Sequence, residues 1–436
     1  MPRVALHTLG CKLNHAETAA IGRQFQERGF DIVEFGEKAD VCVINTCTVT
    51  ERADRECRQI IRRALRSSTD PYVIVTGCYA QLESEEIASI EGVDLVLGSQ
   101  EKFEVFRHLE SLAKEGPPRV HISEPDESWG FGPGYSGAES GRTRAYLKVQ
   151  DGCDYTCSFC TIPLARGLSR SQPVEECLTQ ARRLVEMGHK EIVLTGVNVG
   201  DYGRKSDQDL LGLVRAMVRV DGLLRLRISS IEPNLLTDEL IEFVASSEVV
   251  CRHFHVPLQS GHDDVLRRMR RRYTAGAYAG TIARIRERIP GCGIGVDVIV
   301  GFPGETDAQF EETYRFLNEL PVSYLHVFTY SERPNTPASE APFQVEPRVR
   351  QERNRRLRIL SQKKRHAFYE SMVGTVLPVL TESDVDGTLR TGLADNYVRV
   401  GVPAAGLGEN EIRDVRVVSV ERDLCRGSVV ESVSVT

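Results

Sequence analysis

Short apolar runs rich in β-branched residues alternate with helical patterns along most of this 436-residue chain. In the N-terminal quarter the strand-like runs are Val4–Thr8, Val41–Asn45, Tyr72–Thr76 and Val93–Leu97. Helical patterns lie between them, at Ala16–Arg28, Glu51–Leu65 and Glu83–Ile90. Strands that alternate with helices favour right-handed crossovers and a parallel sheet covered on both faces. We therefore expect residues 1–115 to form a small α/β domain.

The same alternation returns beyond residue 142 over a longer course. Its strand-like runs are Ala145–Val149, Glu191–Thr195, Leu224–Ser229, Arg252–Val256, Gly295–Val300 and Tyr324–Thr329. Six β/α units fit an incomplete (β/α)6 barrel better than a full barrel, which needs about eight. We expect this barrel to span residues 142–368. Periodicity alone also permits an open doubly wound sheet.

Two further segments complete the predicted organisation. Trp129–Gly141 contains five glycines and one proline, which is typical of a turn-rich linker, and we assign residues 116–141 to that linker. Beyond a basic helical segment, shorter strand-like runs occur at Thr375–Thr381, Tyr397–Val402, Ile412–Val420 and Ser428–Val435. Turn signals separate these runs, so we expect a small antiparallel β-barrel over residues 369–436.

Composition limits the class of protein. The chain has 55 Lys and Arg against 62 Asp and Glu, a net charge of −7, which excludes a uniformly basic nucleic-acid binder but not a local basic patch. It shows no secretory signal and no apolar stretch approaching the roughly 18 residues of a membrane span. We therefore expect a cytoplasmic protein. In a reducing compartment its twelve cysteines point to metal binding or catalysis rather than to disulfides.

Three of the cysteines form a tight triplet, Cys153, Cys157 and Cys160, just after the first predicted barrel strand. Soft thiolates at this spacing select Zn, Cu(I) or an iron–sulfur centre. A structural Zn site usually closes with a fourth Cys or His, and none lies nearby in the sequence. A 4Fe–4S cluster on three thiolates leaves one iron open to a ligand. The triplet therefore favours an iron–sulfur site, with a Zn knuckle as the alternative.

Three other cysteines, Cys11, Cys47 and Cys78, each lie two or three residues beyond a predicted strand. Because parallel strands end at one edge of a sheet, where ligand crevices form, these residues could converge on one site. Spacing alone does not decide this, since a buried Cys is commonly a small core residue. The cysteines that match neither triad, which we expect to be structural, are Cys42, Cys57, Cys177, Cys251, Cys292 and Cys425.

The triplet, with an aromatic residue before its last cysteine, resembles the signature of radical S-adenosylmethionine enzymes, whose fold is commonly a partial (β/α)6 barrel. The motifs TLGCKLN, NTC and GCYAQ further resemble the methylthiotransferase family, and the likeness extends to a C-terminal segment similar to a TRAM domain. NTCTVT, GCYAQ and IPLARGLSRS are most similar to the branch that acts on threonylcarbamoyladenosine in tRNA.

This resemblance implies two 4Fe–4S clusters and S-adenosylmethionine as cofactors. Cys153, Cys157 and Cys160 would hold the catalytic cluster, and Cys11, Cys47 and Cys78 an auxiliary one. The reaction implied is transfer of a methylthio group to carbon 2 of threonylcarbamoyladenosine at tRNA position 37, with two S-adenosylmethionine molecules used. The residues implied around S-adenosylmethionine are Phe159, Gly196, Asn198, Glu232, Gln259, Ile299 and Gly301.

The partners implied are a tRNA anticodon stem-loop and an electron donor such as flavodoxin or ferredoxin; we expect a monomer. Five arginines lie between residues 267 and 272, and residues 348–368 hold nine Lys or Arg against one acid. Arginine concentrated this strongly in a net-acidic chain fits binding to a phosphate backbone. The residues we expect to contact RNA are Arg267, Arg268, Arg271, Arg353 and Arg356.

Several alternatives stay open. The same chemistry could act on isopentenyl-adenosine in tRNA or on an aspartate of a ribosomal protein. From other classes, the chain could be a non-enzymatic iron–sulfur carrier or a Zn-stabilised RNA-binding module. His253 and His255 alternate on one predicted strand; without a third ligand, such histidines are more often packed or hydrogen-bonded than metal-bound.

Overall fold

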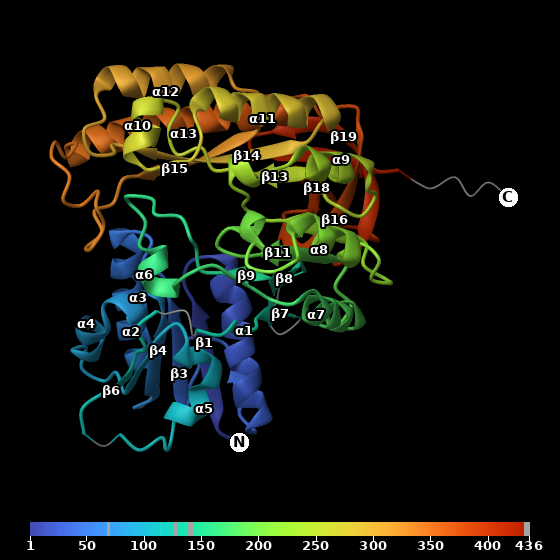
Figure 1. Ribbon diagram of the computed structural model, residues 1–436. Coiled ribbons are helices and arrows are strands. Elements are labelled where there is room, and N and C mark those ends of the chain that lie inside the picture. The colour runs from blue at the N-terminus through green and yellow to red at the C-terminus, as the bar shows by residue number, and fades with distance from the viewer. Residues whose placement is uncertain (68–69, 115, 126–128, 138–142, 431–436) are drawn as a thin grey trace.

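The computed structural model describes residues 1–67, 70–114, 116–125, 129–137 and 143–430. Figure 1 shows an N-terminal α/β part in blue, a central barrel in green to orange, and a C-terminal β-barrel in red. The predicted α/β class and its three parts are confirmed. No helix in the described part of the chain is long and apolar enough to cross a membrane.

The N-terminal part is a six-stranded parallel sheet in the order β2-β1-β3-β4-β5-β6. Its strands are β1 (Arg3–Thr8), β2 (Asp31–Val33), β3 (Val41–Thr46), β4 (Tyr72–Gly77), β5 (Leu95–Leu97) and β6 (Arg119–His121). Its helices are α1 (Lys12–Glu27), α2 (Glu51–Ser67), α3 (Cys78–Leu82), α4 (Ser84–Ala88), η1 (Glu101–Glu104) and α5 (Val105–His108). Every residue of β3 and β4 is buried, as expected for parallel strands covered on both faces. The sequence pattern missed the two edge strands β2 and β6, because three residues are too few to establish a period.

The central part is an incomplete barrel of six parallel strands. They are β8 (Ala145–Lys148), β11 (Glu191–Thr195), β12 (Arg225–Ile228), β13 (His253–His255), β14 (Gly293–Val300) and β15 (Tyr324–Thr329). Isolated bridges from Leu226 to Val250 and from Ser230 to His255 join β12 to the segment of β13. Among the described residues no pairing closes β15 onto β8. The predicted partial (β/α)6 barrel is confirmed.

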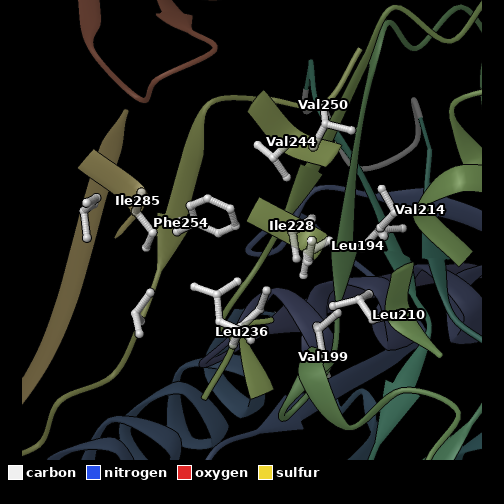
Figure 2. Packing of buried hydrophobic residues seen from close by; sticks show 14 of the residues in the cluster. Leu194, Val199, Leu210, Val214, Ile228, Leu236, Val244, Val250, Phe254 and Ile285 are labelled. Carbon is white, nitrogen blue, oxygen red and sulfur yellow. The ribbon is translucent and has the colours of Figure 1, made fainter. Parts of the chain in front are cut away.

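The longer barrel helices cover the outside of these strands (Figure 1). They are α7 (Val174–Glu186), α8 (Leu210–Met217), α9 (Asp238–Ser246), α10 (Asp263–Arg268), α11 (Ala275–Arg288), α12 (Asp307–Glu319) and α13 (Pro347–Glu370). The short helices α6 (Ile162–Arg166), η3 (Val199–Asp201) and η4 (Pro233–Leu235) lie in the loops that follow β8, β11 and β12. Figure 2 shows part of the core between strands and helices, with Leu194, Ile228 and Phe254 close to Val214 and Val244 of the helices. This apolar layer fixes the strands, so the loops at their carboxyl ends are held on a rigid frame.

The C-terminal part is a closed barrel in the order β16-β17-β18-β20-β19. Its strands are β16 (Val376–Asp386), β17 (Leu389–Ala394), β18 (Arg399–Pro403), β19 (Ile412–Glu421) and β20 (Leu424–Val429). We predicted four strands: β17 was missed because arginine, threonine and glycine interrupt its apolar pattern. The last strand begins at Leu424 rather than at Ser428, and residues 431–436 of that prediction lie outside the described residues.

The turn between β17 and β18 enters the amino-terminal end of the central barrel. Arg227 Nη1 donates to the Asp395 carbonyl oxygen at 2.9 Å, and Arg252 Nε donates to Asp395 Oδ2 at 2.6 Å. The Tyr397 ring stacks on His253 with centroids 4.4 Å apart. These contacts attach the C-terminal barrel to the end of the central barrel opposite its carboxyl-end loops.

The predicted linker, residues 116–141, contributes strands where the structure describes it. β6 pairs with β5 of the N-terminal sheet, and β7 (Tyr135–Ser136) pairs antiparallel with β8. Two short strands, β9 (Gln150–Asp151) and β10 (Arg170–Ser171), pair in the loop that follows β8. The exact domain boundaries stay predictions.

Candidate active site

The three dispersed cysteines meet at the carboxyl edge of the N-terminal sheet. Cys11 precedes α1, Cys47 follows β3, and Cys78 is the first residue of α3. Because β3 pairs with both β1 and β4, the loops after these three strands are neighbours. Burial raises the pKa of the Cys47 thiol, and the nearby thiols of Cys78 and Cys11 raise it further. The structure therefore groups the predicted auxiliary triad.

Gly10 keeps the loops of Cys11 and Cys47 in contact. Its φ of +96° is in the left-handed region that favours glycine, and a Cβ there would lie 2.6 Å from Cys47 Cβ. On the prediction that each triad holds one cluster, we expect Gly10→Ala to displace Cys47 and to remove about half of the iron bound after anaerobic reconstitution. Iron per chain measures this.

Gly29→Ala is the matched control for that substitution. Gly29 also has a positive φ, +82°, but a Cβ there would meet nothing within 4 Å, so this variant should keep its iron. Full iron in Gly10→Ala would contradict the expected contact.

The triplet Cys153, Cys157 and Cys160 lies in the loop at the carboxyl end of β8. The Cys153 N–H donates to the Gly167 carbonyl oxygen at 3.0 Å, and the Cys160 N–H donates to the Cys157 carbonyl oxygen at 3.2 Å. Burial raises the pKa of Cys153 and of Cys160 to about 12. Both thiols are therefore protonated at neutral pH, and metal binding would release their protons.

The spacing of the sulfurs bears on the kind of metal centre. Across the residues that the structure describes, neither triad has all three sulfurs within 4.8 Å of one another. A tetrahedral Zn ion with bonds of about 2.3 Å would draw the sulfurs to about 3.8 Å apart. The sulfurs of neither triad are therefore gathered as closely as a single Zn ion requires.

Arg271 lies beside the triplet rather than on the surface where we predicted RNA contact. Its Nη1 donates to Cys157 Sγ at 3.0 Å, and the guanidinium forms an ion pair with Glu232. Its side chain is 3% exposed, so a phosphate backbone cannot reach it. The prediction for Arg271 is corrected: its charge faces a cysteine sulfur.

A pocket of 190 Å³ lies between the N-terminal part and the central barrel. Its walls are formed by Val49, Thr50, Phe159, Cys160, Thr161, Ile162, Gln259, Asp297, Ile299, Phe328, Thr329, Tyr330 and Ser331. Three residues predicted to surround S-adenosylmethionine, Phe159, Gln259 and Ile299, therefore share one pocket with Cys160. Val49 and Thr50, which directly follow the Cys47 loop, form another part of its wall.

The other residues predicted around S-adenosylmethionine do not line this pocket. Asn198 is 4% exposed, and neither polar atom of its side chain has a hydrogen-bond partner among the described residues. Glu232 binds Arg271, while the Gly301 N–H donates to Glu305 Oε2 at 2.6 Å; Gly196 packs against the Gln150 side chain. Buried amides normally have partners, so Asn198 fits a position that a polar ligand completes.

The remaining arginines predicted to contact RNA differ in their accessibility. Arg353 is buried and pairs with Glu305 at 2.7 Å, so the prediction for Arg353 is corrected. Arg268 donates to the Pro303 carbonyl oxygen at 2.8 Å, and Arg356 pairs with Glu311. Arg267 is well exposed beside Asp264. Of these four, Arg267 is the most open to an RNA backbone.

An ion pair that the sequence did not indicate attaches the Cys47 loop to the barrel. Arg333, beyond β15, pairs with Asp54 at 2.6 Å and donates to Thr48 Oγ1 at 2.6 Å. The Glu51 N–H donates to Ser331 Oγ at 3.0 Å. Arg333 and Asp54 are 279 positions apart, too far for any sequence pattern to link them.

His255 is hydrogen-bonded, as predicted, and belongs to a polar group inside the barrel. Its Nε2 lies 2.9 Å from Asp297 Oδ1, and its Nδ1 lies 2.5 Å from Ser230 Oγ. His326 brings a ring nitrogen within 4.8 Å of both His255 and Asp297. Burial, followed by the neighbouring His255, lowers the pKa of His326, so this ring is neutral at pH 7. Asp297, which lines the pocket, therefore lies against two histidines, His255 and His326.

Comparisons with known proteins agree with this geometry. Residues 147–317 match the Radical SAM superfamily, and residues 3–98 match the uncharacterized protein family UPF0004. The chain is 42% identical, over 97% of its length and 98% of the relative's, to the threonylcarbamoyladenosine tRNA methylthiotransferase MtaB of Bacillus subtilis. It is 35% identical, over 89% of each chain, to the tRNA-2-methylthio-N(6)-dimethylallyladenosine synthase of Syntrophotalea carbinolica.

Among solved structures, the fold is similar to the radical S-adenosylmethionine methyltransferase TsrM of Kitasatospora setae. The TM-score is 0.56 at 15% identity, over 88% of this chain and 79% of that one, a likeness of fold. The full-length relatives decide the family: this chain belongs to the radical S-adenosylmethionine methylthiotransferases.

Proposed function

We propose that this chain transfers a methylthio group to carbon 2 of N6-threonylcarbamoyladenosine at position 37 of tRNA. Membership of the family implies a 4Fe–4S cluster and S-adenosylmethionine at Cys153, Cys157 and Cys160. The second 4Fe–4S cluster, on Cys11, Cys47 and Cys78, is part of the proposal. The relative named MtaB, at 42% identity over nearly the full length, supports this substrate.

The observation that carries the proposal is the pocket shared by both cysteine loops. Cys160 of the triplet lines it, and so do Val49 and Thr50, the second and third residues after Cys47. Methylthio transfer requires a sulfur source and a radical source at the same carbon atom. A base held in this pocket would lie between the two triads, which gives the proximity that such a transfer needs.

The residues of this chain bind and orient the reactants. An aromatic C–H bond is unreactive toward acids and bases, so the bound clusters and S-adenosylmethionine supply the radical and sulfur chemistry. Beside the residues predicted around S-adenosylmethionine, Val49, Ile162 and Phe328 provide apolar walls for a base ring. The Arg333–Asp54 ion pair holds the Cys47 loop against the barrel and so fixes the distance between the two cysteine sites.

The polar group behind Asp297 favours a threonylcarbamoyl substituent over an isopentenyl one. A threonylcarbamoyl group carries N–H and hydroxyl donors from which a carboxylate such as Asp297 accepts hydrogen bonds, whereas its own carboxylate would have to face away from Asp297. Asp297 lines the pocket, with His255 at 2.9 Å and His326 beside both. An apolar isopentenyl group offers Asp297 no donor and would displace water from this carboxylate, so its binding there is less favourable.

The tRNA would approach over the exposed face of α2. This helix begins at Glu51, next to the pocket residues Val49 and Thr50. Its exposed arginines are Arg52, Arg55, Arg62, Arg63 and Arg66. Phosphate contacts of this kind position a nucleic acid without reading its sequence, and the unstacked bases of an anticodon loop can be splayed into a pocket. An electron donor such as flavodoxin or ferredoxin completes the proposed set of partners.

The substrate is tested with reconstituted enzyme, S-adenosylmethionine and dithionite. We expect tRNA carrying threonylcarbamoyladenosine to gain a methylthio group, detected by mass analysis of digested nucleosides. Under the same conditions tRNA carrying isopentenyl-adenosine and a ribosomal protein should gain none. The reason is the hydrogen-bonding requirement of the Asp297 wall.

Two controls accompany this assay. Cys157→Ala enzyme should give no product on any substrate, and tRNA without the threonylcarbamoyl group should react poorly. Methylthiolation of isopentenyl-adenosine tRNA alone would overturn the proposed substrate while leaving the family intact.

A further inference from the structure

Arg166 connects the two cysteine sites. It ends α6, six residues beyond Cys160, and its Nε donates to Cys78 Sγ at 3.2 Å. Cys78 belongs to α3 of the N-terminal part, and Figure 1 shows α6 next to α3. A side chain from the loop of one triad therefore contacts a sulfur of the other triad.

The guanidinium of Arg166 is held in one orientation. Its Nη1 donates to Glu17 Oε1 at 2.9 Å and to Asp151 Oδ1 at 3.0 Å. Its Nη2 donates to Asn14 Oδ1 at 2.7 Å and to Glu17 Oε2 at 3.0 Å. All three nitrogens have partners and the side chain is 2% exposed, so the bond from Nε–H to Cys78 is shielded from bulk solvent.

The buried charges around Arg166 do not balance by themselves. Lys102 pairs with Glu17 at 2.6 Å, and Lys148 pairs with Asp151 at 2.6 Å. Arg166, Lys102 and Lys148 are three cations against the two anions Glu17 and Asp151, a surplus of one positive charge. Arg170, at the solvent side, adds another cation 3.5 Å from Asp151. Buried charges need compensation, and a negative centre at Cys78 supplies it.

We propose that Arg166 is a positioning residue that tunes the auxiliary cluster through Cys78. The inference rests on the second cluster of the proposed function. A hydrogen bond to a ligand sulfur, together with a buried positive charge, stabilises the more negative, reduced state of an iron–sulfur cluster and so raises its reduction potential. Because Arg166 belongs to the loop of the catalytic triplet, it also fixes the position of Cys78 relative to that triplet.

The test isolates each cluster. Cys153→Ala/Cys157→Ala/Cys160→Ala protein should hold only the auxiliary cluster, whose reduction is followed by EPR in a redox titration without tRNA. In that background we expect Arg166→Gln to shift the midpoint potential to a more negative value, since both the charge and the Nε–H are lost. Arg166→Lys should give a midpoint potential between those of wild type and Arg166→Gln, because lysine keeps the positive charge but not the several hydrogen bonds of the guanidinium.

Arg170→Gln is the matched control in the same background. It removes a neighbouring positive charge that does not contact Cys78. The comparison separates the effect of the hydrogen bond to Cys78 from the effect of nearby charge, and Arg170→Gln should shift the midpoint potential less than Arg166→Gln. In the complementary Cys11→Ala/Cys47→Ala/Cys78→Ala protein, Arg166→Gln should leave the potential of the catalytic cluster unchanged. Arg271→Lys should shift it, because Arg271 contacts Cys157 at 3.0 Å.

The outcomes separate the two proposals. If the triple variant that keeps Cys11, Cys47 and Cys78 binds no iron, the second cluster itself is wrong and the role of Arg166 fails with it. If that cluster forms but its potential is the same with Arg166, Lys or Gln at position 166, only the role of Arg166 is overturned. Should Arg166→Gln fail to fold, as judged by circular dichroism, the comparison of Arg166→Lys with wild type decides.

Discussion

Cys157→Ala and Cys47→Ala should each remove about half of the iron of the reconstituted protein, because the proposed function assigns one cluster to each triad. Their effects on chemistry should differ. Cys157→Ala should abolish reductive cleavage of S-adenosylmethionine, since the triplet with the open iron is broken. Cys47→Ala should retain that cleavage but form no methylthio product. Iron analysis, chromatography of 5′-deoxyadenosine and nucleoside mass analysis measure the three quantities.

Cys177→Ala is the matched control for both variants. Cys177 is fully buried in the barrel core on α7 and belongs to neither triad, so its replacement should leave iron and product formation at the wild-type level. Complete loss of iron from either single variant would mean that the six cysteines share one centre, and would contradict two independent clusters.

Glu17→Gln should destabilise the protein by about 3–5 kcal/mol, the usual cost of breaking a buried ion pair. Glu17 is fully buried and pairs with Lys102 at 2.6 Å, Lys148 at 2.8 Å and Arg166 at 2.9 Å. A glutamine fits the same space but leaves these cations with Asp151 as their one remaining carboxylate in this network. Urea unfolding of the cluster-free variant and wild type measures the change in free energy.

The pH dependence of this difference follows from the pKa of Glu17. Burial alone would raise it, but Arg166, Lys102 and Lys148 hold the pKa of Glu17 well below its usual range. The Glu17 ion pairs therefore stabilise the folded state fully above the pKa of a glutamate in the unfolded chain. This stabilisation is lost as the pH falls through the lower pKa that Glu17 has in the folded state. The difference between wild type and Glu17→Gln should be constant from pH 7 to about 5 and shrink only in stronger acid.

Glu104→Gln provides the comparison with a surface pair. Glu104 and Arg107 are 2.9 Å apart but largely exposed, so this substitution should cost at most about 1 kcal/mol. Equal effects of the two substitutions would show that the buried network contributes no more than a surface ion pair.

The strands of the two α/β parts were predictable because burial on both faces requires continuous β-branched runs. β3 and β4 are examples, with every residue buried. β2, β6 and β17 were not predictable, since edge and barrel strands are defined by their neighbours rather than by their own pattern. The two cysteine triads were found for different reasons: Cys153, Cys157 and Cys160 by local spacing, and Cys11, Cys47 and Cys78 by their position after strands and by resemblance.

By itself, the sequence determined the chemistry that this chain can support, because the type of each ligand and the local spacing of the cysteines are known without the fold. Only the tertiary structure decided what each arginine does. Arg166, Arg271 and Arg353 are buried against cysteine or carboxylate groups, whereas Arg267 is exposed, although Arg267 and Arg271 lie in one arginine-rich stretch. The physical reason is that desolvation and Coulomb energy depend on distances in space, and the partners of these arginines come from remote parts of the chain.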